Sequence, residues 1–131
     1  MRRLVFLFLL VGCTDFTAPH GTPVGPLPIY DSWWTDLEHC TDIRADMGRI
    51  EWFQVNGAFD PGTGHEHHGM WTPPHRIHLA LPDVEWLVKH EMLHDLTNGA
   101  GHDHPLFLKC DIAVRFIRES DNKQTGCCSQ W

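Results

Sequence analysis

The feature that most constrains the fold of this chain is the segment HEMLH at positions 90–94, which has the pattern HExxH. Two histidines four positions apart lie on one face of an α-helix, one turn apart, so the imidazoles of His90 and His94 can reach the same ion. Glu91 lies at the edge of that face, where its carboxylate can take a proton from a water on the ion without being a ligand. The pattern therefore predicts a helix that carries two metal ligands, His90 and His94, and a catalytic base, Glu91.

The residues around this segment favour a helix with defined ends. Pro82-Asp83 provides a break and an N-cap, and Glu85 suits the positive N-terminal end. Asn98-Gly99 is a C-terminal stop signal. Apolar residues at helical spacing predict the buried face: Val84, Leu87, Val88, Met92 and Leu96. The alternative is a helix with two surface histidines and a salt-bridging glutamate, because the pattern is short and 11 of the 131 residues are histidine.

A third ligand is expected soon after this helix. A catalytic zinc usually has three protein ligands and one open position. The next candidates are His102 and His104, within the segment GAGHDHPLF at 99–107. Gly99 and Gly101 allow the chain to turn back past the end of the helix. From the spacing alone, either His102 or His104 can complete the site.

Other segments show the spacing of strands and helices. Residues 49–55 and 76–81 alternate between apolar and polar side chains and predict two strands. Residues 33–40 fit either a short helix or a turn. Residues 106–118 predict a second helix, because four residues share one face at helical spacing: Phe107, Cys110, Val114 and Ile117.

A strand followed by a short turn and an HExxH helix resembles the arrangement of the zincin metallopeptidases. Gly101-His102, with Phe107 close behind, is similar to the GHxxxF stretch of the SprT-like proteases, although Phe107 lies one residue further along. The resemblance implies a small α+β domain with a short mixed or antiparallel sheet. It also implies an edge strand packed on the HExxH helix and a second, C-terminal helix.

The resemblance also implies the metal and its ligands. In SprT-like proteases the histidine of the GHxxxF stretch is the third zinc ligand, which implies Zn²⁺ as cofactor held by His90, His94 and His102. His104 is the alternative third ligand, because the position of the phenylalanine departs from the family pattern. The gluzincin pattern fits less well and would assign this role to Glu119.

In zincins the strand before the active-site helix is the sheet edge along which an extended peptide binds. The resemblance therefore implies that residues 76–80 lie beside the substrate, with Ile77, His78 and Leu79 in contact with it. Main-chain pairing at a free strand edge is a general way to hold a peptide. The alternative is a half-buried strand with a polar outer face.

The first twelve residues predict an export signal, since Arg2 and Arg3 precede an apolar run too short to span a membrane as a lasting helix. LVGC at 10–13 resembles a bacterial lipobox, which implies that Cys13 is lipidated and begins the mature chain. Thr14 replaces the aspartate of the inner-membrane retention signal, which implies a lipid-anchored protein of the bacterial cell envelope, at the outer membrane facing the periplasm. An ordinary cleaved signal with an incidental cysteine is the alternative.

This organisation sets the expected partners. Residues 13–32, rich in proline and glycine, predict a tether after the signal at 1–12, and residues 33–131 predict one zincin-like domain. Removing 1–12 takes two of the 10 basic residues and none of the 17 acidic ones, which leaves a formal charge of −9. The acidic balance argues against nucleic acid as a partner. We expect a monomer that acts on a peptide or protein and meets the membrane only through its lipid.

The remaining cysteines predict a disulfide. An even number in an exported chain suggests oxidised pairs, and Cys40–Cys110 is the preferred bridge. Cys127 and Cys128 are adjacent, so they have different partners or one of them stays reduced. A zinc site built from cysteines is the competing hypothesis, but no CxxC spacing occurs.

Two functions of different classes follow. The first is a zinc metallopeptidase in which Glu91 activates water. The second is a periplasmic zinc-buffering lipoprotein without catalysis, which would use His65, His67 and His68 of the glycine-rich loop at 60–69 as readily as the HExxH pair. For that loop the sequence favours a solvated segment, because glycine-rich backbone does not hold ligands rigidly.

Overall fold

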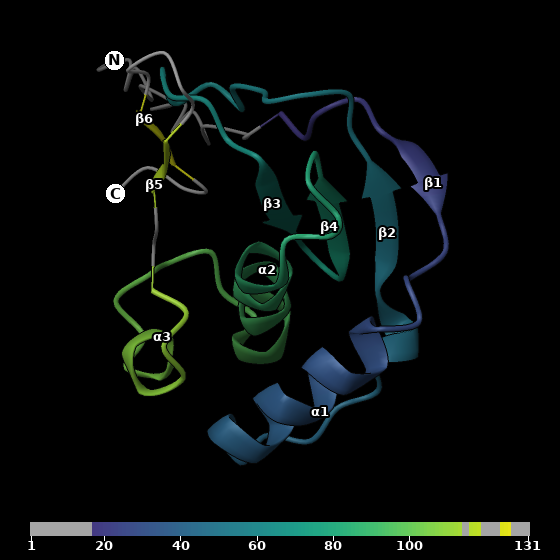
Figure 1. The fold of residues 1–131 in the computed structure, drawn as a ribbon, viewed down its shortest axis with the longest axis vertical. Coiled ribbons are helices and arrows are strands. Elements are labelled where there is room, and N and C mark those ends of the chain that lie inside the picture. Colours follow the sequence, from purple (N-terminus) through teal and green to yellow (C-terminus); the bar gives the residue numbers. More distant parts are fainter. Residues whose placement is uncertain (1–16, 114–115, 119–123, 127–131) are drawn as a thin grey trace, which may run out of the picture.

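The computed structural model describes residues 17–113, 116–118 and 124–126. It has the predicted α+β class, with a mixed four-stranded sheet and helices packed beside it (Figure 1). In chain order the elements are β1 (Thr22–Val24), α1 (Tyr30–Thr41), the 3-10 helix η1 (Met47–Arg49), β2 (Glu51–Gln54), β3 (Gly69–Thr72), β4 (Arg76–Leu79), α2 (Glu85–Thr97), α3 (Leu106–Lys109), β5 (Phe116–Arg118) and β6 (Gln124–Gly126).

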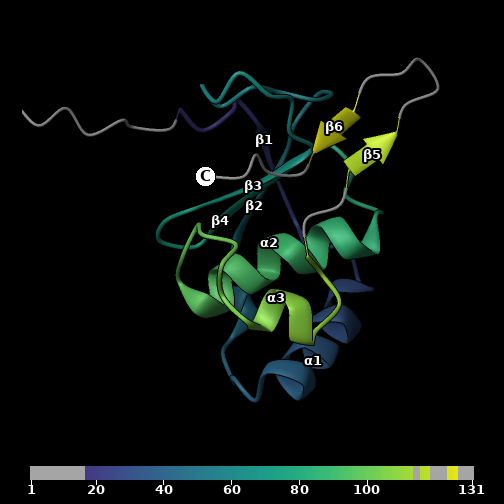
Figure 2. The same ribbon diagram turned by 90° about the vertical axis from the view of Figure 1, so that its left-hand side faces the viewer.

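The sheet has the strand order β1-β2-β4-β3. The pairs β1–β2 and β3–β4 are antiparallel, whereas β2 and β4 are parallel. β5 and β6 form a separate antiparallel pair. Helix α2 packs against β3 and β4, and α1 packs against α2 on the side away from the sheet (Figure 2). The HExxH helix is therefore covered by the sheet on one side and by α1 on another.

The core lies between the sheet and the helices because strand alternation puts large apolar side chains on the face toward α2. Trp52 and Trp71 are both register partners of Ile77, so the three side chains form one row across the sheet. Burying such a row removes a large apolar area from water, which is the main stabilising contribution to the fold. The fully buried residues of α2 that meet it are Leu87, Val88, Met92 and Leu93.

Helix α2 ends where the sequence predicts and begins slightly later. Its N-cap is Val84, which makes no side-chain cap, so the prediction of an Asp83 cap was wrong. Glu85 opens the helix and pairs with Lys89 at 2.7 Å. Asn98 adopts a left-handed conformation with φ of 50°, and the next N–H, that of Gly99, donates to the carbonyl of His94. This turn sends the chain back toward the helix.

The predicted disulfide Cys40–Cys110 is present and joins residues 70 positions apart. It links the C-terminal end of α1 to the residue that follows α3. Cross-linking so long a segment stabilises the fold mainly by limiting the unfolded chain. The end of α1 and the segment after α3 are therefore tied together.

The folded domain begins earlier than the sequence suggested. β1 lies inside the segment predicted to be a tether and pairs with β2. Tyr30 is buried, and its hydroxyl donates to the carbonyl of Pro82 at 2.6 Å. The expected start at Trp33 was therefore too late. Pro23 is compatible with a strand here because β1 is an edge strand.

The second helix is much shorter than the predicted 106–118. α3 ends at Lys109, and Asp111 follows with φ of 54°, a left-handed conformation that does not continue a helix. Residues 116–118 form a strand instead. No helix in the described part of the chain is long and apolar enough to cross a membrane. The signal at 1–12, Cys13, Glu119, Cys127 and Cys128 lie outside the described residues.

Candidate metal centre

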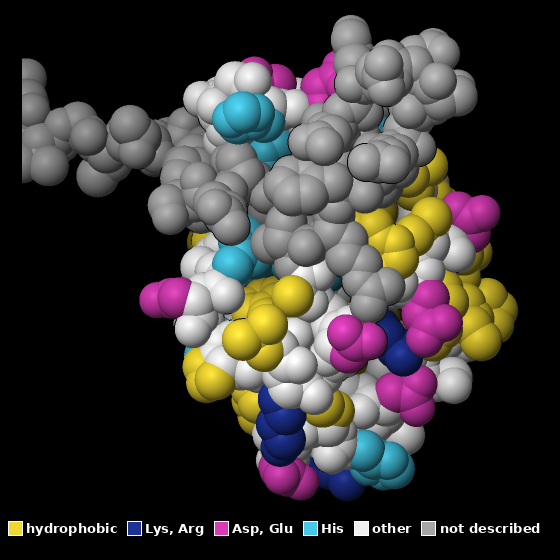
Figure 3. Space-filling model, turned by 60° about the vertical axis from the view of Figure 1, so that its left-hand side comes forward, with side chains coloured by type: hydrophobic (Ala, Val, Ile, Leu, Met, Phe, Trp, Pro, Cys, Tyr) yellow, Lys and Arg dark blue, Asp and Glu magenta, His cyan; other side chains and the backbone are white. Residues whose placement is uncertain are grey.

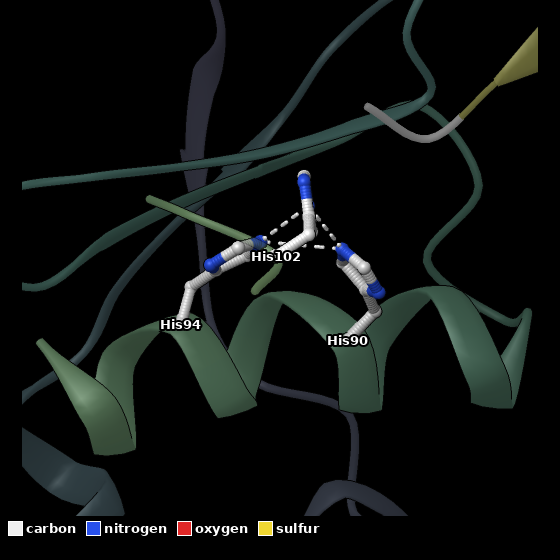
Figure 4. A group of neighbouring side chains, drawn as sticks. All are labelled: His90, His94 and His102. Atoms are coloured by element: carbon white, nitrogen blue, oxygen red, sulfur yellow. Dashed lines mark hydrogen bonds between the residues drawn. The ribbon is translucent and has the colours of Figure 1, made fainter. Parts of the chain in front are cut away.

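Three histidines converge above α2, and they are His90, His94 and His102 (Figure 4). Their Nε2 atoms lie 3.0 Å (His90–His102), 3.1 Å (His94–His102) and 3.2 Å (His90–His94) apart. The first two project from successive turns of α2, and the turn after Asn98 brings the third back over them. His104 is exposed, and its Nδ1 accepts from the backbone N–H of Leu106. The structure thus places His102 in the group and leaves His104 out.

The second ring nitrogen of each helix histidine fixes its protonation. Nδ1 of His90 lies 2.8 Å from the carbonyl of Ile112, and Nδ1 of His94 lies 2.7 Å from the carbonyl of Gly99. A carbonyl only accepts, so both Nδ1 atoms carry the hydrogen and both Nε2 atoms present a lone pair. The short Nε2 contacts are therefore not hydrogen bonds between these two rings.

The lone pairs of His90 and His94 repel one another at this distance, and a cation between them would relieve that repulsion. In a tetrahedral site with metal–nitrogen distances of about 2.0–2.1 Å, ligand nitrogens lie roughly 3.3 Å apart, close to the distances in this group. Burial, followed by repulsion from the neighbouring imidazole, lowers the pKa of His90 to about 3. Burial also lowers the pKa of His94 to about 4. Both rings are therefore neutral at neutral pH, and the group can hold a metal ion.

Phe107 closes the apolar side of this group. Its ring centroid lies 4.9 Å from those of His90 and His94 and 5.5 Å from that of His102. Its side chain is buried, at 1% exposure. The aromatic ring excludes water from the back of the centre, which strengthens electrostatic interactions there. The sequence associated this phenylalanine with the site only through the family resemblance.

Glu91 lies between α2 and β3 and is buried, with 1% of its surface exposed. Burial raises the pKa of its carboxyl group to about 8, while a hydrogen bond from the backbone N–H of Trp71 opposes this shift. Gly69 makes the close approach of β3 possible. A Cβ at that position would stand 2.8 Å from Oε1 of Glu91 and 2.9 Å from Cδ1 of Leu87.

Asp95, one residue after the second motif histidine, is a buried site residue that the sequence analysis missed. Its carboxylate accepts from Nε and Nη2 of Arg49 at 3.0 and 2.7 Å, from Nε1 of Trp71 at 3.1 Å, and from Nδ1 of His75 at 2.8 Å. The signal was an acidic residue on the apolar face of the helix, three positions after Met92. A carboxylate at such a position needs several donors to be buried.

The predicted substrate contacts at Ile77, His78 and Leu79 are not supported. β4 is an interior strand paired with β2 and β3, so neither of its edges can accept a peptide. Ile77 and Leu79 belong to the core. The edge strand that packs on α2 is β3. The prediction placed β4 at the edge because alternation shows which side chains share a face of the sheet but not which strands are neighbours.

The glycine-rich loop lies near the histidine group, which among the described residues consists of His90, His94 and His102. Asp60 accepts from the backbone N–H groups of residues 62–64, which orders the loop. His67 and His68 are buried, so the expectation of a solvated loop was wrong for them, while His65 is exposed. After burial, the charge of His67 is the next factor that lowers the pKa of His102, which places His67 close to the centre.

Comparisons of the chain with protein-family models, with curated proteins and with solved structures found no match. The class of protein is therefore defined by fold and site together: a small α+β domain with a histidine group, on an HExxH helix and the following turn, that can hold a metal ion.

Proposed function

We propose that this protein is a zinc-dependent peptidase that hydrolyses peptide bonds with Glu91 as general base. The observation that carries the proposal is the convergence of three Nε2 atoms on one point, beside a buried glutamate on the same helix. Geometry and residue types both match the requirements of metal-assisted hydrolysis.

The donor set favours a catalytic site over a structural one. His90, His94 and His102 would hold the ion through Nε2, and three protein ligands leave one position open, as catalytic zinc sites do. Nitrogen donors of neutral imidazoles suit zinc among the common divalent ions. When bound, zinc supplies a Lewis acid that polarises a carbonyl oxygen and brings the pKa of a bound water to about 7.

Glu91 moves the proton in this proposal. Its carboxylate takes a proton from the attacking water as the water oxygen bonds to the peptide carbon, and it gives that proton to the nitrogen as the C–N bond breaks. Burial raises the pKa of Glu91 to about 8 in the chain without metal, and a nearby cation favours the ionised form. These opposing effects suit a group that must accept and return a proton near neutral pH.

An extended peptide would bind along β3 rather than β4. No described strand pairs with the side of β3 that faces away from β4. β3 also crosses α2 next to Glu91. Because the Trp71 N–H donates to Glu91, a peptide would pair with the other main-chain groups on this edge. Pairing with a free strand edge is a common mode of peptide recognition, and here it would bring a peptide bond near the three histidines.

The disulfide supports a location outside the cytoplasm, where oxidised cysteine pairs persist. We propose that the protein is exported and anchored in the cell envelope through lipidated Cys13. Folding would then precede or accompany formation of the bridge in an oxidising compartment.

Metal content tests the site first. Zinc in the purified protein should be stoichiometric for wild type, and His90→Ala and His102→Ala should each lose it. His104→Ala is the matched control, because this exposed histidine lies two residues from His102 and outside the group. Retention of zinc by His102→Ala, or its loss in His104→Ala, would contradict the assignment.

Catalysis requires a separate test with fluorescein-labelled casein. Glu91→Gln keeps the size and hydrogen-bonding oxygen of the side chain but removes the base, so it should retain zinc and lose at least about 100-fold in kcat. Zinc-loaded wild type that cleaves no more casein than Glu91→Gln would favour a metal-binding protein without catalysis. Among the described residues, His90, His94 and His102 are the one group close enough to share an ion, which favours one centre over a diffuse buffer, and Figure 3 shows histidine side chains on one face lying apart from one another.

A further inference from the structure

Two residues of β3 direct their main-chain N–H and C=O groups away from β4, toward the edge of the sheet with which no described strand pairs. The N–H of Ala80 donates to the carbonyl of His68 at 2.8 Å, which identifies a hydrogen-bonded pair. Hydrogen-bonded and non-hydrogen-bonded pairs alternate along an antiparallel ladder, so in this register Met70 is the next residue bonded to β4. The main-chain groups of Gly69 and Trp71 therefore face away from β4.

The open edge of β3 lies against Glu91. The backbone N–H of Trp71 donates to the Glu91 carboxyl group. Gly69 lies two residues earlier on the same edge, and a Cβ there would stand 2.8 Å from Oε1 of Glu91. Real Cβ atoms essentially never come this close to another heavy atom. The backbone N–H of Trp71 thus holds the Glu91 carboxyl group, and the carboxyl group fits there because Gly69 has no side chain.

The side chain of Trp71 is fixed by a second contact to the same helix. Its Nε1–H donates to Oδ1 of Asp95 at 3.1 Å. Asp95 follows Glu91 by four positions, so both carboxyl groups lie on one face of α2, one turn apart. Arg49 and His75 also donate to Asp95, which holds it in one orientation. One tryptophan therefore joins β3 to α2 through its main chain and its side chain.

We propose that Trp71 and Asp95 are positioning residues for Glu91. Asp95 fixes the Trp71 side chain, and the Trp71 N–H then holds the Glu91 carboxyl group beside the three histidines. Gly69 provides the clearance for this contact. A general base must be held to within about 0.5 Å of its working position, and a backbone donor on a sheet is a rigid support. The consequence for catalysis rests on the proposed function, whereas the contact itself does not.

Amide hydrogen exchange tests the contact without any substrate. The Trp71 amide should be protected in wild type, and Glu91→Ala should speed its exchange about 10- to 100-fold, the effect of losing one hydrogen bond to a carboxyl group. Glu91→Gln retains an accepting oxygen and should keep most of the protection. The Met70 amide, which bonds to β4, is the control in the same spectra and should not change.

A pair of tryptophan variants tests the role of Asp95. Trp71→Phe removes the indole donor, so exchange of the amide at position 71 should rise and kcat on fluorescein-labelled casein should fall about tenfold with KM and zinc content unchanged. Trp34→Phe is the matched control. It removes a buried indole that donates to the carbonyl of Ala45 at 3.0 Å, away from the centre, and should alter neither readout.

The outcomes separate this inference from the proposed function. Equal exchange of the Trp71 amide in wild type and Glu91→Ala, or equal effects of the two tryptophan variants, would overturn the positioning role even in an active peptidase. If wild type binds zinc but cleaves no casein, the proposed function fails. The exchange data then still decide whether β3 holds Glu91.

Discussion

The two faces of the sheet bury histidines in different ways. On the face toward α2, His90 and His94 each donate Nδ1–H to a backbone carbonyl and direct Nε2 to a common point. On the opposite face, His78 stacks on Phe53 with ring centroids 4.7 Å apart. Neither ring nitrogen of His78 has a hydrogen-bond partner among the described residues, although the side chain is only 4% exposed.

The contrast shows that a lowered pKa does not identify a metal ligand. Burial is the first cause of the lowered pKa of His90, His94 and His78 alike. Burial makes each imidazole neutral, but only a hydrogen bond at one nitrogen fixes which nitrogen keeps its lone pair. His78 lacks that bond, so its ring has no preferred direction for a ligand. The partners of a buried group indicate its role better than its pKa does.

The same comparison extends to other buried polar side chains, which differ in the number of donors or acceptors they meet. Among the described residues, Asp95 accepts from three residues, the Tyr30 hydroxyl donates to one carbonyl, and the ring nitrogens of His78 have no partner. If the number of hydrogen-bond partners determines how much a buried polar group contributes to stability, the loss in the free energy of unfolding should be largest for Asp95, smaller for Tyr30 and smallest for His78.

The largest effect is expected at Asp95. Asp95→Asn keeps the shape of the side chain but removes the charge that Arg49 faces at 2.7 Å, with the Asp95 side chain fully buried. The Arg49 side chain is 32% exposed, so water compensates only part of the charge left behind, and the free energy of unfolding should fall by about 2–3 kcal/mol. Urea denaturation of the metal-free protein measures this loss without any contribution from the ion.

Glu51→Gln is the control for Asp95→Asn. Glu51 and Arg76 also form an ion pair, at 3.0 Å, but both side chains are more than half exposed. An exposed pair contributes at most about 1 kcal/mol, because water and salt screen it. Similar losses for the two variants would show that charge alone, rather than burial among several donors, explains the effect at Asp95.

A smaller effect is expected at Tyr30, which has a single partner. Tyr30→Phe removes the hydrogen bond to Pro82 and leaves that carbonyl without its donor, at a cost of about 1 kcal/mol at pH 7. Burial, with Asp83 as second cause, raises the pKa of Tyr30 to about 12.

The pH dependence of Tyr30 has a definite sign. The unfolded chain ionises near pH 10 and the folded chain only near 12, so the Tyr30 contribution is fully present below pH 10 and is lost as pH rises toward 12. Urea denaturation at pH 7, 10 and 11.5 should show a steeper loss for wild type than for Tyr30→Phe. Parallel curves would mean that Tyr30 ionises normally in the folded protein.

The elements with strong local signals could be predicted from the sequence. Helix α2 and its stop at Asn98 follow from periodicity and from a residue that tolerates the left-handed conformation. His90 and His94 follow from spacing on that helix. The even number of cysteines suggested a disulfide, with Cys40–Cys110 as the preferred pair, and the third histidine of the group followed from the family resemblance.

Strand order and the positioning of Glu91 could not be predicted. Alternation shows which side chains of a strand share a face, but two strands with the same pattern can be neighbours or not, so β4 was placed at the edge instead of β3. β1 escaped notice because Pro23 opposes a strand except at an edge. The role of Asp95 depends on donors from Arg49 and Trp71, which are distant in sequence.

The smallest effect on the free energy of unfolding is expected at His78. This position also gives the most direct test of the contrast with His90 and His94. His78→Phe keeps the stacking on Phe53 and removes two nitrogens without partners, so at pH 8 the free energy of unfolding should change by less than about 1 kcal/mol. Burial, and then the charge of Arg76, lowers the pKa of His78 in the folded chain. The unfolded chain therefore takes up a proton first as pH falls below 6.5, and wild type loses stability that the variant keeps.

This difference should reach at most about 2 kcal/mol between pH 8 and pH 5, measured by urea denaturation of both proteins without metal. Since His90 and His94 remain in both, their acid dependence cancels in the comparison. His39→Phe, at an exposed position of α1, is the matched control and should follow wild type. Equal pH dependence of wild type and His78→Phe would mean that His78 accepts a proton in the folded state. The protonation of His78 would then differ less from that of an exposed histidine than its lack of hydrogen bonds indicates.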